Sequence, residues 1–252
     1  MQAPEYWAKL PLGHGVRLIA RDENGMAAFA KPAGILSHPN TPGDRPRALL
    51  TCDYDHGREC FVWRGPDDCE ARLWLLNRLD SATSGVILAA ADHTVAQAVK
   101  DQFVRKRVNK VYQALVFGSP RAQKEIWRDR LAVEKRGGVI RAGTAGNIPA
   151  ESHFSVLRRR PGQPPLALVQ LDPRTGRSHQ LRVQCARRGL PIVGDQTYGD
   201  FRLNREFARH TGLKRLFLHS LESRFSYELA GRSFTFAASA PLPEEFAAAL
   251  KV

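Results

Sequence analysis

Two short apolar runs that bracket one polar loop constrain the fold of this chain more than any other feature. Residues 73–76 lead into the loop 77–85, and residues 86–91 lead away from it. Apolar runs of this length, bounded by polar residues and glycine, are typical of buried strands. Loops at the ends of such strands are held by a rigid sheet and often carry catalytic groups. We therefore predict two core strands with a candidate site at their ends.

The loop contains one carboxylate, Asp80, beside Arg78 and the hydroxyl residues Ser81, Thr83 and Ser84. An Asp followed by Ser and Thr is also a common turn former, because its carboxylate accepts hydrogen bonds from nearby backbone N–H groups. Taken alone, the loop fits either a simple turn or a catalytic acid. The rest of the chain has to decide between them.

Hydrophobic periodicity elsewhere predicts more strands than helices. Strands are expected at residues 16–21, 26–30, 110–117, 152–157, 166–171, 216–227 and 233–238, and helices at 92–107, 177–189 and 244–250. Asn24-Gly25 predicts a hairpin, and Thr94 with Gln97 has the spacing of a helix capping box. Because several strands adjoin as hairpins, we predict an α+β fold with a mixed, largely antiparallel sheet and flanking helices.

Two segments give weaker patterns. Residues 40–68 are rich in Pro, Gly and Asp and show no sustained period, which predicts a long surface excursion with one short helix near residues 48–54. Residues 127–145 are basic and dotted with Gly, and they match no element.

The charge of the chain indicates the class of partner. Lys and Arg total 38 against 25 Asp and Glu, a net charge of +13, and 29 of the 38 are Arg. Arg binds phosphate through a planar fork of donors and stacks on bases, so this excess favours nucleic acid as the partner. Any single block, such as residues 105–107, 158–160 or 187–188, equally fits a solvated face or a helix C-terminus. Those interpretations do not explain the total.

Neither a membrane span nor a signal peptide is evident, so we expect a cytoplasmic protein without membrane association. The spacing of Cys52, Cys60, Cys69 and Cys185 contains no C-x-x-C pair, which disfavours zinc. Cys52, His56 and Cys60 have a spacing compatible with a metal site, but an ordinary loop explains them better. We expect reduced cysteines and no metal.

Asp80, Tyr112 and Arg182 could act together on a nucleotide. A guanidinium beside a carboxylate keeps that carboxylate ionised and oriented. A Tyr ring offers a flat surface for a base, as in enzymes that act on flipped-out nucleotides. The alternatives are a half-buried strand residue for Tyr112 and a helix-surface cation for Arg182. From the chemistry of these residues alone, we therefore predict only a basic protein that modifies nucleotides.

Six motifs in one order resemble the RluA-type RNA pseudouridine synthases over residues 16–246. The motifs are Lys31-Pro-Ala-Gly34 with His38-Pro39, Asn77-Arg-Leu-Asp-Ser-Ala-Thr-Ser-Gly85, Lys110-Val-Tyr-Gln-Ala114, Gly176-Arg-Ser-His-Gln-Leu-Arg-Val183, Gly194-Asp-Gln-Thr-Tyr-Gly199 and Leu218-His-Ser220. The resemblance implies the pseudouridine synthase fold with a central catalytic cleft. It also implies a single catalytic domain, 1–252, without the separate N-terminal S4 RNA-binding domain that some members carry.

The resemblance assigns a role to each candidate residue. Asp80 would be the catalytic carboxylate, and Arg182 would pair with it. Tyr112 would pack against the target base and is a candidate proton acceptor at C5. Arg78 would enter the RNA stack where the flipped uridine leaves a gap.

The implied reaction is an isomerisation in which the N1–C1′ bond of uridine breaks and C5 joins C1′. Nothing is oxidised or transferred, so no cofactor or metal is expected. Attack of Asp80 on C1′ and removal of a sugar proton both remain open. We expect ribosomal or transfer RNA as the partner, and a monomer.

Three positions depart from the family pattern: Asn77 and Gln184 stand where His is frequent, and Ser178 where Thr is usual. None removes a candidate site residue. One rival hypothesis is a catalytically inactive RNA-binding or ribosome-assembly protein on the same fold. Another is a nucleosidase that acts on small molecules. The net charge of +13 disfavours it, because a small neutral substrate does not need a strong positive electrostatic field to be attracted.

Overall fold

The computed structural model describes residues 4–65, 68–136 and 139–251. The chain forms two compact units: unit 1 is Met1–Val108 with Glu222–Ala240, and unit 2 is Asn109–Leu221 with Pro241–Val252. In both units antiparallel strands pair and helices pack against them, which confirms the predicted α+β class.

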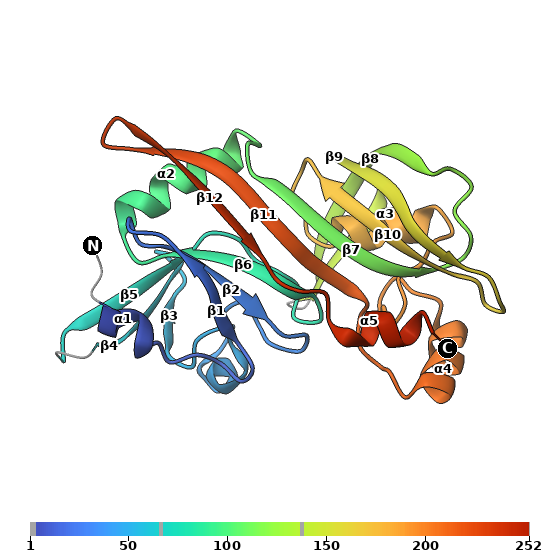
Figure 1. Ribbon diagram of the computed structural model, residues 1–252, viewed down its shortest axis with the longest axis horizontal. Coiled ribbons are helices and arrows are strands. Elements are labelled where there is room, and N and C mark those ends of the chain that lie inside the picture. The colour runs from blue at the N-terminus through green and yellow to red at the C-terminus, as the bar shows by residue number, and fades with distance from the viewer. Residues whose placement is uncertain (1–3, 66–67, 137–138, 252) are drawn as a thin grey trace. The chain divides into compact units, whose positions relative to one another are not determined.

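The unit 1 sheet has the strand order β3-β4-β5-β6-β2-β1 (Figure 1). Its strands are β1 (Arg17–Arg21), β2 (Met26–Lys31), β3 (Asp53–Asp55), β4 (Cys60–Arg64), β5 (Glu70–Leu75) and β6 (Ser84–Ala90). A second pair, β11 (Leu218–Leu229) with β12 (Arg232–Ser239), contributes its Glu222–Ala240 part to unit 1. These elements confirm the predicted hairpin at the start of the chain, the two core strands around the loop and the closing strand pair.

Strand β6 is buried along its whole length because both faces of the sheet are covered. Val86 and Leu88 belong to a core shared with β11, β12 and helix α2 (His93–Val104). Ile87 and Ala89 point the other way, into a core shared with helix α1 (Pro4–Ala8). This alternation is the period of a strand, and it explains why the sequence reads as a continuous apolar run.

Helix α2 was predicted from its apolar stripe, but its cap was assigned to the wrong residue. The N-cap is Asp92, whose carboxylate accepts from the backbone N–H groups of Thr94 and Val95. Asp is as good a cap as Thr, and here it sits at the residue where the extended chain ends.

The segment 40–68 differs from its prediction. A 3₁₀ helix, Pro42–Arg47, lies before the predicted helix at 48–54, where Leu49 and Leu50 are fully buried and β3 then begins. The helix prediction was therefore wrong. The segment also supplies β4, which pairs with β5, so part of it belongs to the sheet.

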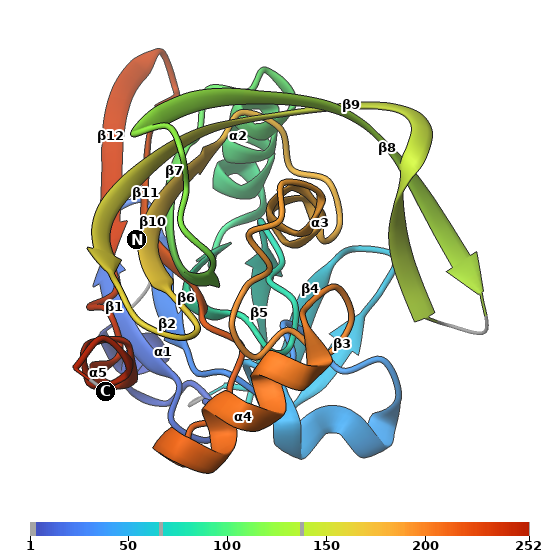
Figure 2. The ribbon, with the colours of Figure 1, turned by 90° about the vertical axis from the view of Figure 1, so that its right-hand side faces the viewer.

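Unit 2 contains antiparallel strands that pair in the order β7-β10-β9-β8. Its elements are β7 (Asn109–Phe117), β8 (Lys124–Arg136), β9 (Val139–Arg160), β10 (Leu166–Pro173), α3 (Gln180–Arg187), α4 (Phe201–Thr211) and α5 (Glu244–Ala249). Helix α3 lies under the long β8–β9 hairpin (Figure 2). Strands β8 and β9 include residues 127–136 and 139–145, to which the sequence assigned no element, while residues 137 and 138 lie outside the described residues.

Helix α3 begins later than predicted, at Gln180 instead of residue 177. His179 takes the left-handed conformation, φ 56°, which a helix cannot continue. The buried Gln180 side chain accepts from the Arg177 N–H and from the Thr175 hydroxyl. These bonds hold the residues before the helix in a turn. Among the described residues, no helix is long and apolar enough to cross a membrane.

Candidate active site

The loop that carries Asp80 connects β5 to β6. Hydrogen bonds from its first residues to β6 continue the β5–β6 pairing past the end of β5. The Leu76 N–H donates to the Leu88 carbonyl at 3.0 Å. One residue on, the Asn77 side-chain oxygen accepts from the Leu88 N–H at 2.7 Å. Within the loop, the Thr83 N–H donates to the Asp80 carbonyl at 3.0 Å. Asn77 therefore has a structural role at a position where the family often has His.

Two buried polar residues hold the loop backbone on either side of Asp80. The Ser37 hydroxyl donates to the Leu79 carbonyl at 2.7 Å and accepts from the Leu79 N–H at 2.9 Å. On the other side, the Lys31 ammonium donates to the Ser81 carbonyl at 3.0 Å. The same ammonium also donates to two carbonyls of its own loop, those of Pro32 and Ile35. Lys31 is 1% exposed, so these charge-assisted bonds form away from water.

The two loop side chains with predicted roles differ in exposure. Asp80 is half-buried, and Arg78 is exposed. Burial lowers the pKa of His38, and the charge of Arg78 lowers it further, although the Pro39 carbonyl opposes the shift. An exposed Arg is able to contact RNA, because its guanidinium binds phosphate and stacks on bases.

Tyr112 lies on β7 of unit 2, opposite Leu171 of β10, and is half-buried. Two residues earlier, burial lowers the pKa of Lys110. A Cβ added to Gly176 would lie 3.6 Å from the Lys110 Nζ, so the motifs that contain these two residues meet.

Arg182 on α3 is buried and forms a bidentate ion pair with Asp195. Its Nε donates to Asp195 Oδ2 at 2.8 Å and its Nη2 to Oδ1 at 2.7 Å. Burial alone would raise the pKa of Asp195, but the bonds from Arg182 and from the Tyr198 and Thr197 N–H groups outweigh it and lower the pKa. The pair therefore stays charged while it is shielded from water, and Arg182 is no helix-surface cation.

The loop after α3 also positions the Tyr198 ring near Arg182. Its guanidinium carbon lies 5.1 Å from the centre of the Tyr198 ring, within cation–π range. The Tyr198 hydroxyl is 2.9 Å from His179 Nδ1. Asn204 fixes the loop, because its amide donates to the Asp195 carbonyl and accepts from the Gly194 N–H.

The sequence of this chain matches a known protein family. Residues 25–187 match the family described as RNA pseudouridylate synthase, which is more than half of the chain. This chain belongs to that family.

Two relatives illustrate the range of the pseudouridine synthases that resemble it. The ribosomal large subunit pseudouridine synthase C of Vibrio vulnificus is 38% identical over 159 residues, which are 63% of this chain and 49% of the relative. The tRNA pseudouridine synthase C of Yersinia pestis is 32% identical over 235 residues, 88% of this chain and 86% of that protein. The chain thus spans about half the length of the Vibrio relative.

Two solved human structures share the pseudouridine synthase fold. RNA Pseudouridylate Synthase Domain Containing 1 superposes with a TM-score of 0.67 at 21% identity, covering 99% of this chain and 90% of that one. RNA Pseudouridylate Synthase Domain Containing 4 gives 0.64 at 24% identity, covering 92% and 91%. The predicted fold is therefore confirmed.

The candidate residues of this family member are divided between the units. Asp80 and Arg78 belong to unit 1, whereas Tyr112 and Arg182 belong to unit 2. The pairing of Arg182 with Asp80 and the packing of Tyr112 on a base stay predictions.

Sequence reasoning gave no role to three residues that the structure places around the candidate groups, namely Lys31, Ser37 and Asp195. Lys31 and Asp195 stand in motifs that the family resemblance already included, so a signal existed. Their partners lie too far along the chain for spacing to reveal them. Ser37 stands just before the His38-Pro39 pair and gave no signal of its own.

Proposed function

We propose that this chain is an RNA pseudouridine synthase that isomerises a specific uridine in structured RNA, with Asp80 as the catalytic carboxylate. Membership of the family supports the reaction. The observation that carries the choice of residue is the pair of clamps, Ser37 on Leu79 and Lys31 on Ser81, that fix the backbone on both sides of Asp80. A catalytic group has to be held this firmly, because a misplacement of about 1 Å costs about 10²-fold in rate.

The proposed chemistry balances within one nucleoside. The N1–C1′ bond breaks, the uracil turns, a C5–C1′ bond forms, and the proton on C5 leaves while N1 regains one. Asp80 acts at the sugar, by attack on C1′ or by removal of a sugar proton. Tyr112 packs against the base and takes the C5 proton. No step needs a cofactor or a metal.

Arg182 is proposed to pair with Asp80 and keep it ionised when the site is dry. Asp195 supports this role, because its two bonds orient the guanidinium and its charge partly offsets the guanidinium charge. Arg78 is proposed to fill the gap that the flipped uridine leaves in the RNA stack.

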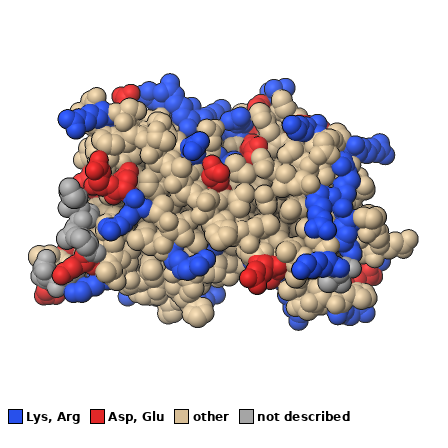
Figure 3. Space-filling view, viewed as in Figure 1, with Lys and Arg blue, Asp and Glu red and all other residues tan. Residues whose placement is uncertain are grey.

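The proposed substrate is ribosomal or transfer RNA, and the proposed setting is the cytoplasm, with the chain acting as a monomer. Lys and Arg side chains reach the surface across the face shown in Figure 3. Arg158 and Arg159 on β9 are exposed. The block at 187–188 is different, because Arg187 and Arg188 both bind Asp129 and therefore support the fold.

Pseudouridine mapping tests the proposal. All stable RNAs are mapped from wild-type cells, from cells lacking the protein and from cells carrying Asp80→Asn. We expect at least one site to vanish in both deficient strains, and its position identifies the RNA. The rival binding protein predicts that Asp80→Asn cells keep every site while RNA affinity still falls with salt. Retention of every site in both strains would contradict the proposed activity.

A further inference from the structure

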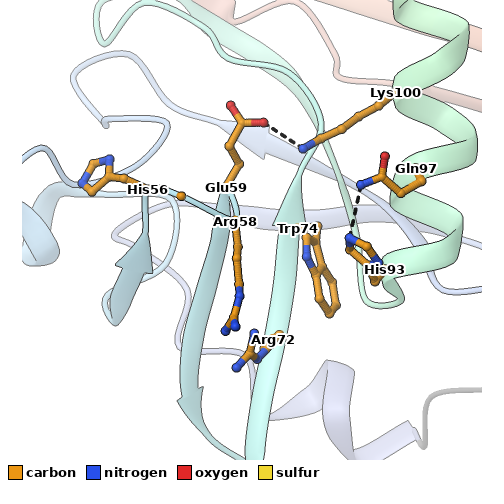
Figure 4. Close-up of a pocket in the computed structure, with 9 residues that line it drawn as sticks. His56, Arg58, Glu59, Arg72, Trp74, His93, Gln97 and Lys100 are labelled. Carbon is orange, nitrogen blue, oxygen red and sulfur yellow. Dashed lines mark hydrogen bonds and ion pairs between the residues drawn. The ribbon is translucent and has the colours of Figure 1, made fainter.

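Unit 1 carries a second candidate site, a groove between strand β5, the turn before β4 and helix α2 (Figure 4). Its volume is about 560 Å³. Pockets that hold small molecules measure roughly 300–1,000 Å³, so the groove is large enough for a nucleotide. None of its lining residues belongs to the loop 77–85, and the proposed reaction gives none of them a task.

One wall of the groove is aromatic. The rings of Trp74 on β5 and His93 on α2 face one another with centres 5.5 Å apart and planes inclined by 54°. His93 is exposed and Trp74 is partly exposed, so a ring surface remains open to solvent. A nucleobase gains by stacking on such a surface whatever its sequence.

The rest of the groove is cationic. Arg58, Arg72 and Lys100 line it against one carboxylate, Glu59, so the lining carries three positive charges and one negative charge, a net +2 with His counted as neutral. Glu59 binds Lys100 at 2.8 Å, and Glu70 on β5 accepts from Nε and Nη2 of Arg72. The Arg58 guanidinium is held more loosely, with its Nη1 3.8 Å from Asp55 Oδ2. Ion pairs at this exposure are worth little, so a phosphate group can replace them at small cost.

A cluster of rings borders the groove. His38 stacks on Tyr54 with ring centres 4.6 Å apart and planes 9° apart. His56, which lines the groove, contacts the Tyr54 ring edge-on at 5.1 Å. The positive charge of Arg78 acts to lower the pKa of both His38 and Tyr54, two rings of this cluster. The loop 77–85, the ring cluster and the groove all belong to unit 1.

We propose that this groove binds an unpaired nucleotide of the substrate RNA, with the base against Trp74 and His93 and the phosphate at Arg58 and Arg72. The proposal rests on the proposed function, because it takes the RNA presented to Asp80 as the ligand. The ring cluster guides the strand from the target uridine to the groove. The groove is then a second contact that selects RNAs with an unpaired segment near the modified uridine.

Binding variants test the proposal directly. The probe is a fluorescently labelled single-stranded RNA of about ten nucleotides, within the site size of such surfaces. The variants are Arg58→Ala, His93→Ala, Trp74→Ala and Trp74→Phe. Arg64→Ala is the matched control, because Arg64 is also exposed, has an Asp nearby and lies on β4 outside the groove.

We expect Trp74→Ala to weaken binding roughly tenfold and Trp74→Phe to retain most of it, because a ring remains for stacking. Arg58→Ala should lower the slope of log affinity against log salt by about 0.7, the value for one phosphate contact on a single strand. His93→Ala should weaken binding less than Trp74→Ala, and Arg64→Ala should match the wild type. If Trp74→Ala does not fold, the two exposed positions, Arg58 and His93, decide the outcome.

Activity separates failure of this proposal from failure of the proposed function. The substrate is RNA labelled with tritium at uridine C5, taken from cells that lack the protein, and isomerisation releases the tritium. We expect the groove variants to raise KM with little change in kcat. An active wild type whose groove variants bind and react like Arg64→Ala would overturn the groove proposal alone. An inactive wild type would overturn the proposed function instead.

Discussion

Arg182 and Asp195 form a buried, two-bonded ion pair in which Nε and Nη2 of the guanidinium each donate to a different carboxylate oxygen, at 2.8 and 2.7 Å. Asp195 is 1% exposed and Arg182 7%. The carboxylate also accepts from two backbone N–H groups of its own loop. The pair therefore fixes one edge of the guanidinium relative to the loop that follows α3.

Replacing Asp195 should destabilise the fold strongly. Asp195→Ala leaves a buried guanidinium without this partner, and removing one member of a buried pair costs about 3–5 kcal/mol. We expect the free energy of unfolding, measured in urea, to fall by an amount in that range. Arg202 and Glu206 form an exposed pair on α4 that serves as the control. Glu206→Ala should change stability by less than about 1 kcal/mol. Equal losses in both variants would contradict this account.

Much of the fold followed from local sequence pattern. The strands around the loop 77–85, the hairpin closed at Asn24-Gly25 and the stripe of α2 each depend on neighbours within a few residues, which the sequence shows directly. Helix α4 could also have been predicted, because Asp200 caps its start and Gly212, with φ 73°, ends it.

The parts that the sequence did not reveal depend on distant contacts. Leu49 and Leu50 are buried because α1 and the sheet cover them, although their neighbours read as a loop. Likewise Lys31 resembles an ordinary exposed cation until its contact with the backbone of Ser81, fifty residues away, is known. Asp80 itself could be named only because its motif resembles a family, since its loop alone fits a turn equally well.

Lys31→Met should disturb the Asp80 loop while leaving the protein folded. Met keeps the apolar stem, but the loop loses a donor shared by three carbonyls, and a bond to a charged group is worth about 1.5–3 kcal/mol. We expect kcat for tritium release to fall by about 10²-fold with a smaller change in KM. Lys9→Met, at an exposed lysine of the same unit, is the control and should retain activity. Full activity in Lys31→Met would show that this clamp does not position Asp80.

Ser37→Ala tests the opposite clamp. The substitution removes one hydroxyl and leaves the N–H and the carbonyl of Leu79 without these bonds, at a cost of about 1–3 kcal/mol. We expect a loss of that size in the free energy of unfolding, together with faster amide hydrogen exchange at Leu79. Ser226→Ala is the control, because the Ser226 hydroxyl bonds only to that of Thr235 among the described contacts, and both residues are largely exposed. Unchanged exchange at Leu79 would be inconsistent with a clamp.

His38 should make the stability of unit 1 depend on pH. Its pKa lies below the ordinary 6.5, first because of burial and then because of Arg78 and His56, although the Pro39 carbonyl and Glu59 oppose the shift. The folded state thus favours the neutral ring. As the pH falls below 6.5 the unfolded chain takes up the proton first, so stability is lost until the pH passes the lower folded pKa. Phe keeps a ring to stack on Tyr54 but does not titrate, so His38→Phe should lose this part of the slope in urea unfolding between about pH 7.5 and pH 5. A His38→Phe variant with the full wild-type slope would assign the pH dependence to another group.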